Sequence, residues 1–464
     1  MADGGPLDLS GRRRIHVVGV GGAGMSAIAT VLAATGHDVT GSDRRPSAVL
    51  DRLAGLGIPV HAGHDPAQGA GADLMAVSTA IPADNPEVVA ARHAGVEVAS
   101  RARILAAICT MRRVVAVAGT HGKTTTSAML ATILVTAGWS PSWIIGGDVP
   151  ALGGGGRWDP AGAWMVVEAD ESDGTFLALP REAGVVTSVE ADHLDFYGDE
   201  TAMRGAYETF LAGCPGARVV CADEPGAAHL GQRVASLGLP ATTYGTSAGT
   251  TFTMGAVIHA RTTVTFEIEG PDGERGHVEL AVPGLHNARN ALGALVTAVA
   301  VGVPFDIAIA GLGRFAGVAR RLELRGERAG VTYIDDYAHL PGEVATVVGT
   351  TSRAGWGRVV AVFQPHRYTR TAALHREFAD AFLGADMVVV TGIYPSGETP
   401  IPGITGRLVA DAVAAAHPDL PLRYCEDLDD LVTVLGGLLE PGDLCLTLGA
   451  GDLTEIPGRM VAGS

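Results

Sequence analysis

Lysine is nearly absent from this sequence of 464 residues. Of its 33 basic residues, Lys123 alone is a lysine and all the others are arginines. Against 50 acidic residues they leave a formal net charge of −17. Such an excess of negative charge opposes nonspecific attachment to nucleic acid or to an anionic membrane, so we expect neither as a partner.

Cysteines and long apolar runs are also scarce. The five cysteines form no Cys-x-x-Cys pair, which argues against a disulfide framework and a zinc ribbon. The apolar stretch from Ala291 to Phe305 contains Pro304 and is followed by Asp306, so it falls short of the ~20 residues that a membrane span needs. The run from Ile15 to Val20 is too brief for a signal-peptide core. We therefore expect a soluble, cytoplasmic protein.

Short β-branched runs alternate with helical patterns, which is typical of α/β units with parallel sheets. At roughly 100–200 residues per domain, the length predicts two to four domains. Two strand, glycine-loop and helix patterns begin near residues 15 and 114, and a further set of strands follows residue 330. We predict a Rossmann-like domain over 1–107, a central domain with a mixed sheet over 108–318, and a Rossmann-like domain over 319–464. The segment GTHGKTTT (119–126) marks the central domain as P-loop ATPase-like.

The first glycine motif is Gly19-x-Gly21-x-x-Gly24, placed between a predicted strand and helix, with Asp43 ending the next strand. Its glycines would let the backbone approach a pyrophosphate at a helix N-terminus, and Asp43 could accept a hydrogen bond from a ribose hydroxyl. NAD, FAD and UDP-sugars all carry a pyrophosphate, so the motif does not select among them. The alternative is a merely tight turn from strand to helix.

The second glycine motif, Gly119-Thr-His-Gly-Lys-Thr-Thr-Thr126, follows a predicted buried strand and opens a helix. It supplies backbone amides for phosphates, a lysine for the β- and γ-phosphates and a hydroxyl for Mg²⁺. Its spacing departs from the general P-loop, because the residue five before Gly122 is Val117. A compact ammonium fits phosphates in a way that a planar guanidinium does not, which explains why position 123 keeps lysine. We predict binding of a nucleoside triphosphate.

Two acidic segments follow neighbouring predicted strands. Residues 168–173 contain four acids after the strand Trp164–Val167, and Glu190-Ala-Asp-His193 follows the strand Val185–Val189. Carboxylates at a strand end beside a P-loop commonly hold Mg²⁺. The alternatives are a solvated acidic loop and a structural histidine.

The remaining motifs suit a base and a small anion. Asn287 and Asn290 lie three apart on one helical face, where amides could meet a base edge, although asparagine is also a common helix cap. Arginines and histidines gather after strands of the last third, the edge at which open α/β sheets bind ligands. Arg367 and Arg370 could clamp a carboxylate, and the alternative is an interdomain salt-bridge patch.

Taken together, these motifs resemble the Mur ligases of peptidoglycan synthesis nearly from end to end. The segments that carry the resemblance are HVVGVGGAGMSAIA (16–29), GTHGKTTT (119–126), EADESDGTFL (168–177), EADHLD (190–195), GLHNARNAL (284–292), RRLE (320–323), DDYAHLPGE (335–343), FQPHRYTRT (363–371) and YPSGETPIPG (394–403).

The resemblance implies that the first domain binds the UDP moiety, the second ATP and the third an amino acid. It implies ATP and Mg²⁺ as cofactors, UDP-N-acetylmuramate and L-alanine as substrates, and a monomer or homodimer. The implied catalytic residues are Lys123, His193, Arg321 and His339. Implied ATP contacts are Gly119, Thr120, His121, Gly122, Lys123, Thr124, Thr125, Asn287, Asn290, Arg321 and Asp336. Implied substrate contacts are Gly21, Gly22, Gly24, Asp43, Tyr337, His339, Arg367 and Arg370, and the implied metal ligands are Thr124, Glu168 and His193.

The implied reaction joins L-alanine to the lactyl carboxylate of UDP-N-acetylmuramate through an acyl phosphate, with release of ADP and phosphate. Three alternatives stay open: a ligase of the same family that adds a preformed tripeptide during murein recycling, a noncatalytic nucleotide-sensing homologue, and a dehydrogenase. The P-loop argues against the dehydrogenase.

The chain also departs from the family pattern. The family's usual His-His-Pro-Thr-Glu run reads His339-Leu340-Pro341-Gly342-Glu343, and Ser188 replaces the usual asparagine before the Glu-Ala-Asp-His run. Sister ligases place a second Mg²⁺ with a carbamylated lysine. Because no lysine other than Lys123 exists, the resemblance implies a mechanism without that group.

Overall fold

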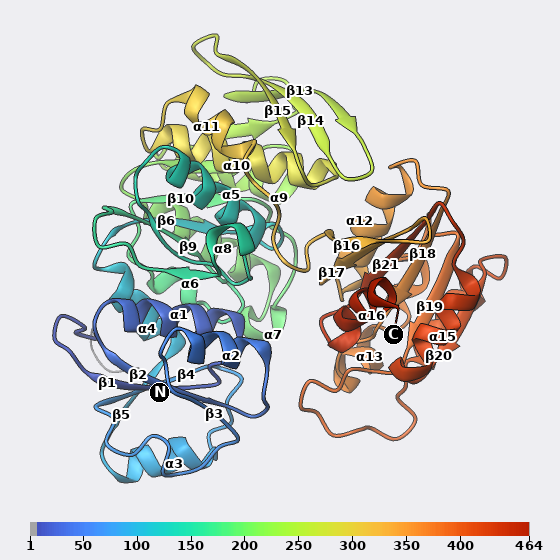
Figure 1. The fold of residues 1–464 in the computed structure, drawn as a ribbon. Coiled ribbons are helices and arrows are strands. Elements are labelled where there is room, and N and C mark those ends of the chain that lie inside the picture. Colours follow the sequence, from blue (N-terminus) through green and yellow to red (C-terminus); the bar gives the residue numbers. More distant parts are fainter. Residues whose placement is uncertain (1–6, 464) are drawn as a thin grey trace. The chain divides into compact units, whose positions relative to one another are not determined.

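A computed structural model describes residues 7–463, and its strands form three sheets (Figure 1). The first sheet has the order β3-β2-β1-β4-β5, with every neighbouring pair parallel. Its strands are β1 (Arg14–Val18), β2 (Asp38–Asp43), β3 (Val60–Ala62), β4 (Leu74–Val77) and β5 (Glu97–Ser100), and its helices are α1 (Ala23–Ala34), α2 (Ala48–Gly55), α3 (Pro86–His93) and α4 (Arg101–Cys109).

The first strand and helix form where their apolar residues predict them. In β1, Ile15, Val17 and Val18 are almost fully buried, as expected of a central parallel strand. In α1, apolar residues that include Met25 and Leu32 lie on the buried side of the helix. The helix ends at Ala34, Thr35 caps it, and Gly36 then takes a left-handed φ of 97°, a conformation that favours glycine.

The second sheet has ten strands in the order β15-β14-β13-β12-β11-β10-β6-β9-β7-β8. It is mixed, because β7 and β8 pair antiparallel while β6 pairs parallel with both β9 and β10. Its strands are β6 (Arg113–Ala118), β7 (Ser142–Ile144), β8 (Gly156–Arg157), β9 (Trp164–Glu168), β10 (Ala183–Val186), β11 (Arg218–Cys221), β12 (Thr242–Gly245), β13 (Phe252–His259), β14 (Val264–Glu269) and β15 (Arg275–Leu280). Its helices are α5 (Lys123–Thr136), η1 (Pro150–Leu152), α6 (Thr175–Ala178), α7 (Leu194–Tyr197), α8 (Glu200–Ala212), α9 (Pro225–Ser236), α10 (Leu285–Ala300) and α11 (Phe305–Leu312).

One strand of this sheet is shorter than the sequence predicts. We predicted a strand over Val185–Val189, but β10 ends at Val186. The Thr187 amide still donates to the Ala118 carbonyl, and the Thr187 hydroxyl then donates to the His121 carbonyl. Side-chain hydrogen bonds to the glycine loop thus replace the strand ladder, a competition that hydroxyl residues commonly win at strand ends.

The third sheet has the order β16-β17-β21-β18-β19-β20, parallel except for the antiparallel edge pair β16–β17. Buried aliphatic residues cover both of its faces, as in other doubly wound sheets. Its strands are β16 (Glu323–Arg328), β17 (Val331–Asp336), β18 (Arg358–Phe363), β19 (Met387–Thr391), β20 (Leu422–Cys425) and β21 (Asp443–Leu448). Its helices are α12 (Pro341–Ser352), α13 (Tyr368–Leu374), η2 (Glu377–Asp380), α14 (Arg407–Ala416), α15 (Leu428–Leu438), η3 (Asp452–Glu455) and α16 (Ile456–Ala462).

These sheets confirm the predicted α/β class, with Rossmann-like first and third sheets and a mixed central sheet. By the density of their contacts, the residues form two compact units. The first unit holds the first sheet and most of the second, and the second unit holds the third sheet together with residues 257–265 and 280–285. The domain boundaries near 107 and 318 stay a prediction.

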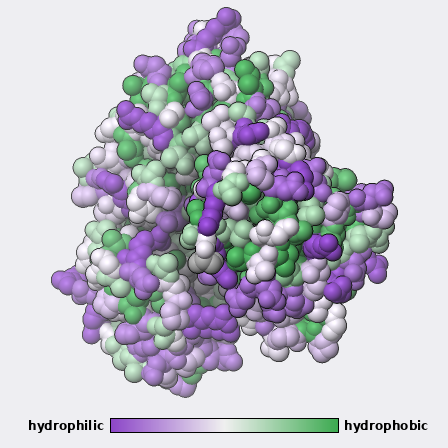
Figure 2. Space-filling view, turned by 45° about the vertical axis from the view of Figure 1, so that its right-hand side comes forward, coloured by the Kyte–Doolittle hydropathy of each residue, from purple (hydrophilic) through white to green (hydrophobic). Residues whose placement is uncertain are grey.

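The surface carries its large hydrophobic side chains mostly in isolation. Hydrophilic and hydrophobic residues are intermixed over the face seen in Figure 2. The most exposed large side chains include Ile258, Leu56 and Phe196, which come from separate segments of the chain. Within residues 7–463, no helix combines the length and apolar character that a membrane crossing requires.

Candidate active site

The first glycine motif forms a tight turn between β1 and α1. Gly19 has a φ of 80°, and the amides of Gly19 and Val20 both donate to the Ser42 carbonyl. The Gly21 amide donates to Asp43 Oδ2 at 2.8 Å, so Asp43 braces the turn itself. Gly22 precedes α1 without any side-chain cap, and Gly24 lies in its first turn. The amides at this helix start suit a phosphate group.

The second glycine motif is packed so closely that two of its residues have to be glycine. Gly119 and Gly122 have φ values of 133° and 82°. A Cβ on Gly119 would overlap the Thr187 hydroxyl, and one on Gly122 would overlap the side-chain amide of Asn290. Asn290 of α10 therefore lies directly against the loop that precedes α5. This contact unites two motifs that stand far apart in the sequence.

Lys123 opens α5 and is held on three sides. Its Nζ donates to the Gly119 carbonyl at 2.7 Å, to the Thr120 carbonyl at 3.3 Å and to Glu171 Oε1 at 2.8 Å. The ion pair with Glu171 is nearly shielded from solvent, with 15% and 3% of the two side chains exposed. Although burial lowers the pKa of Lys123, the adjacent Glu171 carboxylate outweighs that effect and raises it. The ammonium therefore stays charged.

Thr124 and Glu168 lie next to this lysine and offer oxygen ligands. The Thr124 hydroxyl donates to Glu168 Oε1 at 3.0 Å, and the Gly146 amide donates to Glu168 Oε2 at 2.7 Å. A hydroxyl and a carboxylate at the end of β9 are the donor types that Mg²⁺ prefers. The residues present thus fit the ion that the sequence predicts. Thr125, the next residue of α5, is buried.

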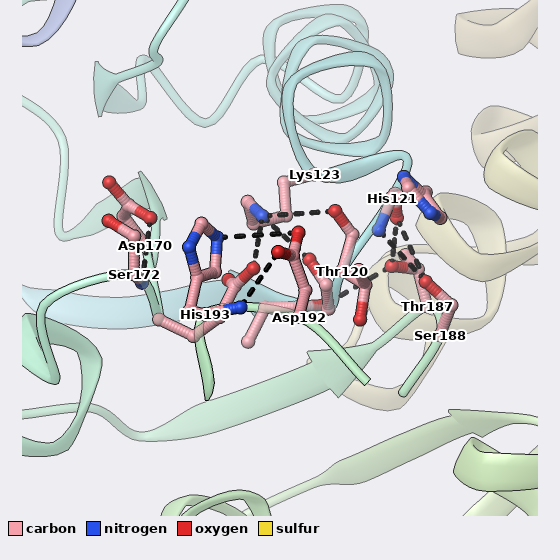
Figure 3. A network of polar contacts seen from close by, with 12 residues as sticks. Thr120, His121, Lys123, Asp170, Ser172, Thr187, Ser188, Asp192 and His193 are labelled. Atoms are coloured by element: carbon pink, nitrogen blue, oxygen red, sulfur yellow. Dashed lines mark hydrogen bonds and ion pairs between the residues drawn. The ribbon is translucent and has the colours of Figure 1, made fainter. Parts of the chain in front are cut away.

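The loop before α7 carries His193 (Figure 3). His193 has a left-handed φ of 53°, and its Nε2 lies 3.5 Å from Asp192 Oδ2. His121, in the glycine loop before α5, has its Nε2 3.5 Å from Glu190 Oε2. In the described part of the chain, no three His, Cys, Asp or Glu side chains converge as a metal cluster. The structure thus joins Thr124 to Glu168 but pairs His193 with Asp192, and the metal role of His193 stays a prediction.

Figure 3 also shows how Thr120 and His121 are fixed by the chain that follows β10. The His121 amide donates to Ser188 Oγ at 2.9 Å, and Thr120 Oγ1 accepts the Glu190 amide at 2.9 Å. Ser188, which departs from the family's asparagine, therefore still binds the glycine loop. On α10, Asn287 and Asn290 are both buried, and their role toward adenine stays a prediction.

In the third sheet, Asp336 braces the backbone of its own domain. It is 4% exposed, and its two carboxylate oxygens accept the amides of Leu322 and Ala338, each at 2.8 Å. Burial raises the pKa of Asp336 to about 6 despite the opposing charge of Arg321. We predicted that Asp336 contacts ATP, and that role stays a prediction. In the structure, the Asp336 carboxylate fixes the backbone at Leu322, directly after Arg320 and Arg321.

Those arginines flank an aromatic ring. The guanidinium carbons of Arg320 and Arg321 lie 5.1 and 5.2 Å from the ring centroid of Tyr337, within the range of cation–π attraction. Arg320 also donates to the carbonyls of Gly449 and Gly451, so it is tied to the loop after β21. Arg321 is the arginine that we predicted to meet ATP.

His339 lies at the centre of the residues that we predicted to receive the amino acid. Its ring meets those of Tyr337 and His366 edge-on, with centroids 5.3 and 5.4 Å away. Its amide donates to Glu343 Oε2 at 3.0 Å, and Arg370 Nη1 lies 3.0 Å from His366 Nδ1. Burial, the nearby His339 ring and the positive charge of Arg370 lower the pKa of His366 to about 3, and burial lowers the pKa of His339. Both imidazoles are therefore neutral near pH 7.

Arg367 occupies a strained position beside this pocket. It precedes α13 with a φ of 68°, and its amide donates to the Tyr394 carbonyl at 2.9 Å. Backbone strain in a residue other than glycine is retained where the surrounding structure enforces it, often at ligand sites. Tyr337, His339, His366 and Arg370 thus form a chain of contacts at one edge of the third sheet, and Arg367 is adjacent to His366 in sequence; we call this cluster the His339 pocket.

Sequence reasoning missed several residues that shape these sites. Glu171 was noted only as part of an acidic run, yet it is the ion-pair partner of Lys123. Glu343 accepts the His339 amide, and the sequence shows it only as the end of a familiar motif. Arg101 stands outside every motif, and nothing in its neighbourhood signals its partners at positions 170 and 173.

The fold and these loops define an α/β protein with a triphosphate-type glycine loop and a separate arginine- and histidine-lined pocket. Three family models match it: "Mur ligase family, catalytic domain" over residues 14–113, "Mur ligase middle domain" over 164–298 and "Mur ligase, glutamate ligase domain" over 320–451. The chain belongs to the Mur ligase family.

Individual relatives are similar over nearly the whole length. A UDP-N-acetylmuramate–L-alanine ligase of Kineococcus radiotolerans is 45% identical over 450 residues, covering 96% of this chain and 94% of that one. The enzyme of the same name from Solidesulfovibrio magneticus is 43% identical and covers 96% of each chain.

Solved structures match as well. The UDP-N-acetylmuramate-alanine ligase MurC of Thermotoga maritima aligns with a TM-score of 0.85 at 29% identity, covering 97% of this chain and 99% of that one. A murein peptide ligase of Psychrobacter arcticus aligns with a TM-score of 0.70 at 23% identity, covering 97% of this chain and 98% of that one. At this identity, the similarity supports the fold alone.

Proposed function

We propose that this protein is an ATP-dependent ligase that joins L-alanine to the lactyl carboxylate of UDP-N-acetylmuramate, giving ADP and phosphate, in peptidoglycan precursor synthesis. The observation that carries the proposal is the Lys123 centre, in which a buried, charged ammonium stands at the start of α5 beside Thr124 and Glu168. The names and high identities of the full-length relatives support the choice of alanine.

The glycine turn before α1 suits the first substrate. The amides at the start of α1, in the turn that Gly21 and Asp43 brace, would receive the diphosphate of the UDP group. The lactyl carboxylate must then approach the γ-phosphate of ATP. Because both groups are anionic, their encounter requires positive charge, which Lys123 supplies. Arg321 is the second cation that we assign to this task.

Mg²⁺, when bound, would neutralise phosphate charge and orient the triphosphate. Thr124 and Glu168 would hold it, since their oxygens already lie 3.0 Å apart. We include His193 as a further ligand. To bind the ion, its ring would have to give up its contact with Asp192. With Lys123 already engaged by Glu171, no other lysine exists to carry a carbamate.

The pocket around His339 suits the second substrate. Arg367 and Arg370 would receive the alanine carboxylate, because guanidinium groups bind carboxylates through paired hydrogen bonds. The amine has to lose a proton before it attacks the acyl carbon. His339 is the base that we assign to this step, since burial lowers the pKa of its ring, and Glu343, 3.4 Å from its Nδ1, would stabilise the protonated ring.

The main rival within the family is a ligase that adds a tripeptide to the same sugar nucleotide. The murein peptide ligase of Psychrobacter arcticus shares the fold at 23% identity, against 45% identity for an alanine-adding relative. A noncatalytic nucleotide-binding homologue is the rival from another class. We expect a soluble, cytoplasmic protein, as a monomer or homodimer.

Phosphate release from purified protein separates these readings. The assay contains MgATP and UDP-N-acetylmuramate with alanine, with the tripeptide L-alanyl-γ-D-glutamyl-meso-diaminopimelate, or with neither. We expect release that depends on both the sugar nucleotide and alanine. Release that responds to the tripeptide instead would favour the recycling ligase, and no substrate-dependent release would favour the noncatalytic homologue.

A further inference from the structure

The guanidinium of Arg101 links α4, the helix that follows the last strand of the first sheet, to the acidic loop beside Lys123. Arg101 is the first residue of α4. Its Nη2 donates to Asp170 at 2.8 Å and to Asp173 at 3.1 Å, both on the loop that follows β9. All three residues belong to the first compact unit. One side chain thus ties the nucleotide-type sheet to the loop of the triphosphate site.

The two aspartates hold the shape of their own loop at the same time. The second oxygen of Asp170 accepts the Ser172 amide at 3.1 Å, and that of Asp173 accepts the Thr175 amide at 3.0 Å. Each carboxylate therefore fixes loop backbone with one oxygen and Arg101 with the other. A displacement of Arg101 must be passed to the loop backbone or break these bonds.

The same loop carries the carboxylates of the triphosphate site. Glu168 at its start contacts Thr124, and Glu171, adjacent to Asp170, contacts Lys123. Asp170 and Asp173 hold Arg101, and Glu171 between them holds Lys123. The Arg101 and Lys123 positions are therefore coupled through one segment of four residues.

The other side of the guanidinium is close to the glycine turn. Arg101 Nη1 lies 3.7 Å from where a Cβ would stand on Gly24, in the first turn of α1. Arginine has five N–H donors, and the two on Nη2 of Arg101 donate to the two aspartates. Nε is buried and has no hydrogen-bond partner within the described residues. The side chain therefore keeps donors unused next to the turn that faces the sugar nucleotide.

We propose that Arg101 is a positioning residue that couples the two nucleotide sites: its Nη1 contacts the diphosphate of the UDP-sugar bound at α1, while its Nη2 sets the acidic loop that presents Glu168 and Glu171 to MgATP. The proposal rests on the proposed function, because that function supplies the UDP-sugar. Binding of one nucleotide then fixes a side chain on which the site of the other depends, so each ligand tightens the other.

Calorimetric titration of the full-length protein tests this coupling. Mg²⁺ and an ATP analogue with an imido bridge between the β- and γ-phosphates are titrated with and without saturating UDP-N-acetylmuramate, and UDP alone serves as a third arm. We expect the sugar nucleotide to tighten analogue binding by about tenfold, within the usual range for coupled sites. UDP alone should retain most of this effect, because it carries the diphosphate.

Arg101→Gln should reduce the tightening to about twofold or less, since the amide can neither hold both aspartates nor reach a phosphate. Arg101→Lys should keep the charge but not the coupling, because one ammonium cannot serve three anions in a planar arrangement. Arg103→Gln is the matched control: Arg103 lies on the same helix and pairs with Glu97 of the first sheet at 2.9 Å. It should keep the wild-type coupling. A thermal unfolding transition reports whether each variant is folded.

The outcomes separate this inference from the proposed function. A wild-type protein that binds no UDP-N-acetylmuramate contradicts the proposed function. A wild-type protein that binds both ligands without mutual tightening overturns the role of Arg101, as does a folded Arg101→Gln variant with full coupling. Equal loss of coupling in Arg101→Gln and Arg103→Gln would reduce Arg101 to a structural link between sheets and also overturn the proposal.

Discussion

The Lys123 centre and the His339 pocket both bury ionisable groups at the ends of parallel strands, yet they stabilise them in opposite ways. In the Lys123 centre, three carboxylates of the acidic loop face a cation, since Asp170 and Asp173 face Arg101 and Glu171 faces Lys123. In the third sheet, Asp336 accepts its hydrogen bonds from backbone amides, and the imidazole of His339 is kept neutral by burial. The pKa of Asp170 accordingly falls to about 2 and that of Asp336 rises to about 6.

This difference matches the chemistry that we assign to each region. A triphosphate with its metal ion is a concentrated charge, and a site already built from opposing charges can exchange partners without creating an unpaired ion. An amine nucleophile has to be neutral to react, so its pocket benefits from a neutral base. The comparison therefore predicts that substitutions of charged residues in the Lys123 centre reduce turnover most. Substitutions in the His339 pocket should instead weaken amino-acid binding.

The largest effect should come from Lys123→Arg. A planar guanidinium cannot occupy the compact position bounded by Gly119, Thr120 and Glu171, and loss of one preorganised transition-state contact typically costs about 10²–10³ in turnover. We expect phosphate release to fall by about a thousandfold with little change in the melting temperature. Arg204→Lys, the reverse exchange in an exposed pair with Glu200 on α8, is the control and should stay fully active. An active Lys123→Arg enzyme would refute the argument from the single lysine.

The next largest effect concerns stability and pH at Asp336. Its pKa is about 6 in the folded protein, above the ordinary aspartate value of about 3.9 expected in the unfolded chain, so between these values the folded state binds more protons than the unfolded state. The free energy of unfolding should therefore fall as the pH rises from about 4 to 6, by roughly 3 kcal/mol at most. In Asp336→Asn this contribution is absent, so the gap in melting temperature between wild type and variant should narrow over that range. A constant gap would contradict the raised pKa.

A moderate effect is expected from Arg370→Ala. Loss of a charge-assisted hydrogen bond to the alanine carboxylate costs about 1.5–3 kcal/mol, which corresponds to a roughly 10- to 150-fold rise in the KM for alanine. The KM for ATP should change little, because this arginine lies in the other region. Arg376→Ala, at an exposed position just after α13, provides the control. A rise in the KM for ATP as large as that for alanine would break the assignment of the pocket.

The smallest effect is expected from Leu340→His, which restores the family's usual residue. Leu340 precedes α12 next to His339, and its amide donates to Glu343 at 3.2 Å. A new imidazole there adds about one hydrogen bond, so the KM for alanine should change by about fivefold. An unchanged KM would show that the departure is neutral.

The sequence predicted the strand, glycine-turn and helix units well, because glycine turns and buried β-branched strands are local signals. The turn at Gly19 and the helix that starts at Lys123 lie where their patterns place them. The end of β10 was misjudged, since apolar Val189 continues the strand pattern while the Thr187 hydroxyl diverts the backbone toward His121.

The partners of the site residues were harder to predict, because they depend on contacts between distant segments. Glu171 reaches Lys123 across 48 residues, and Arg101 reaches Asp170 across 69. No local spacing encodes these distances. The double hydrogen bonding of Asp336 was also invisible, since it requires backbone amides that the fold alone brings to it.

Trapping the acyl phosphate with hydroxylamine tests the division between the two regions most directly. With MgATP, UDP-N-acetylmuramate and hydroxylamine in place of alanine, an activated lactyl carboxylate is captured as a hydroxamate. We expect Arg370→Ala to form the hydroxamate at a rate near that of the wild type while ligating alanine poorly, and Lys123→Arg to lose both products. Loss of the hydroxamate in Arg370→Ala as complete as in Lys123→Arg, or its retention in Lys123→Arg, would contradict the account.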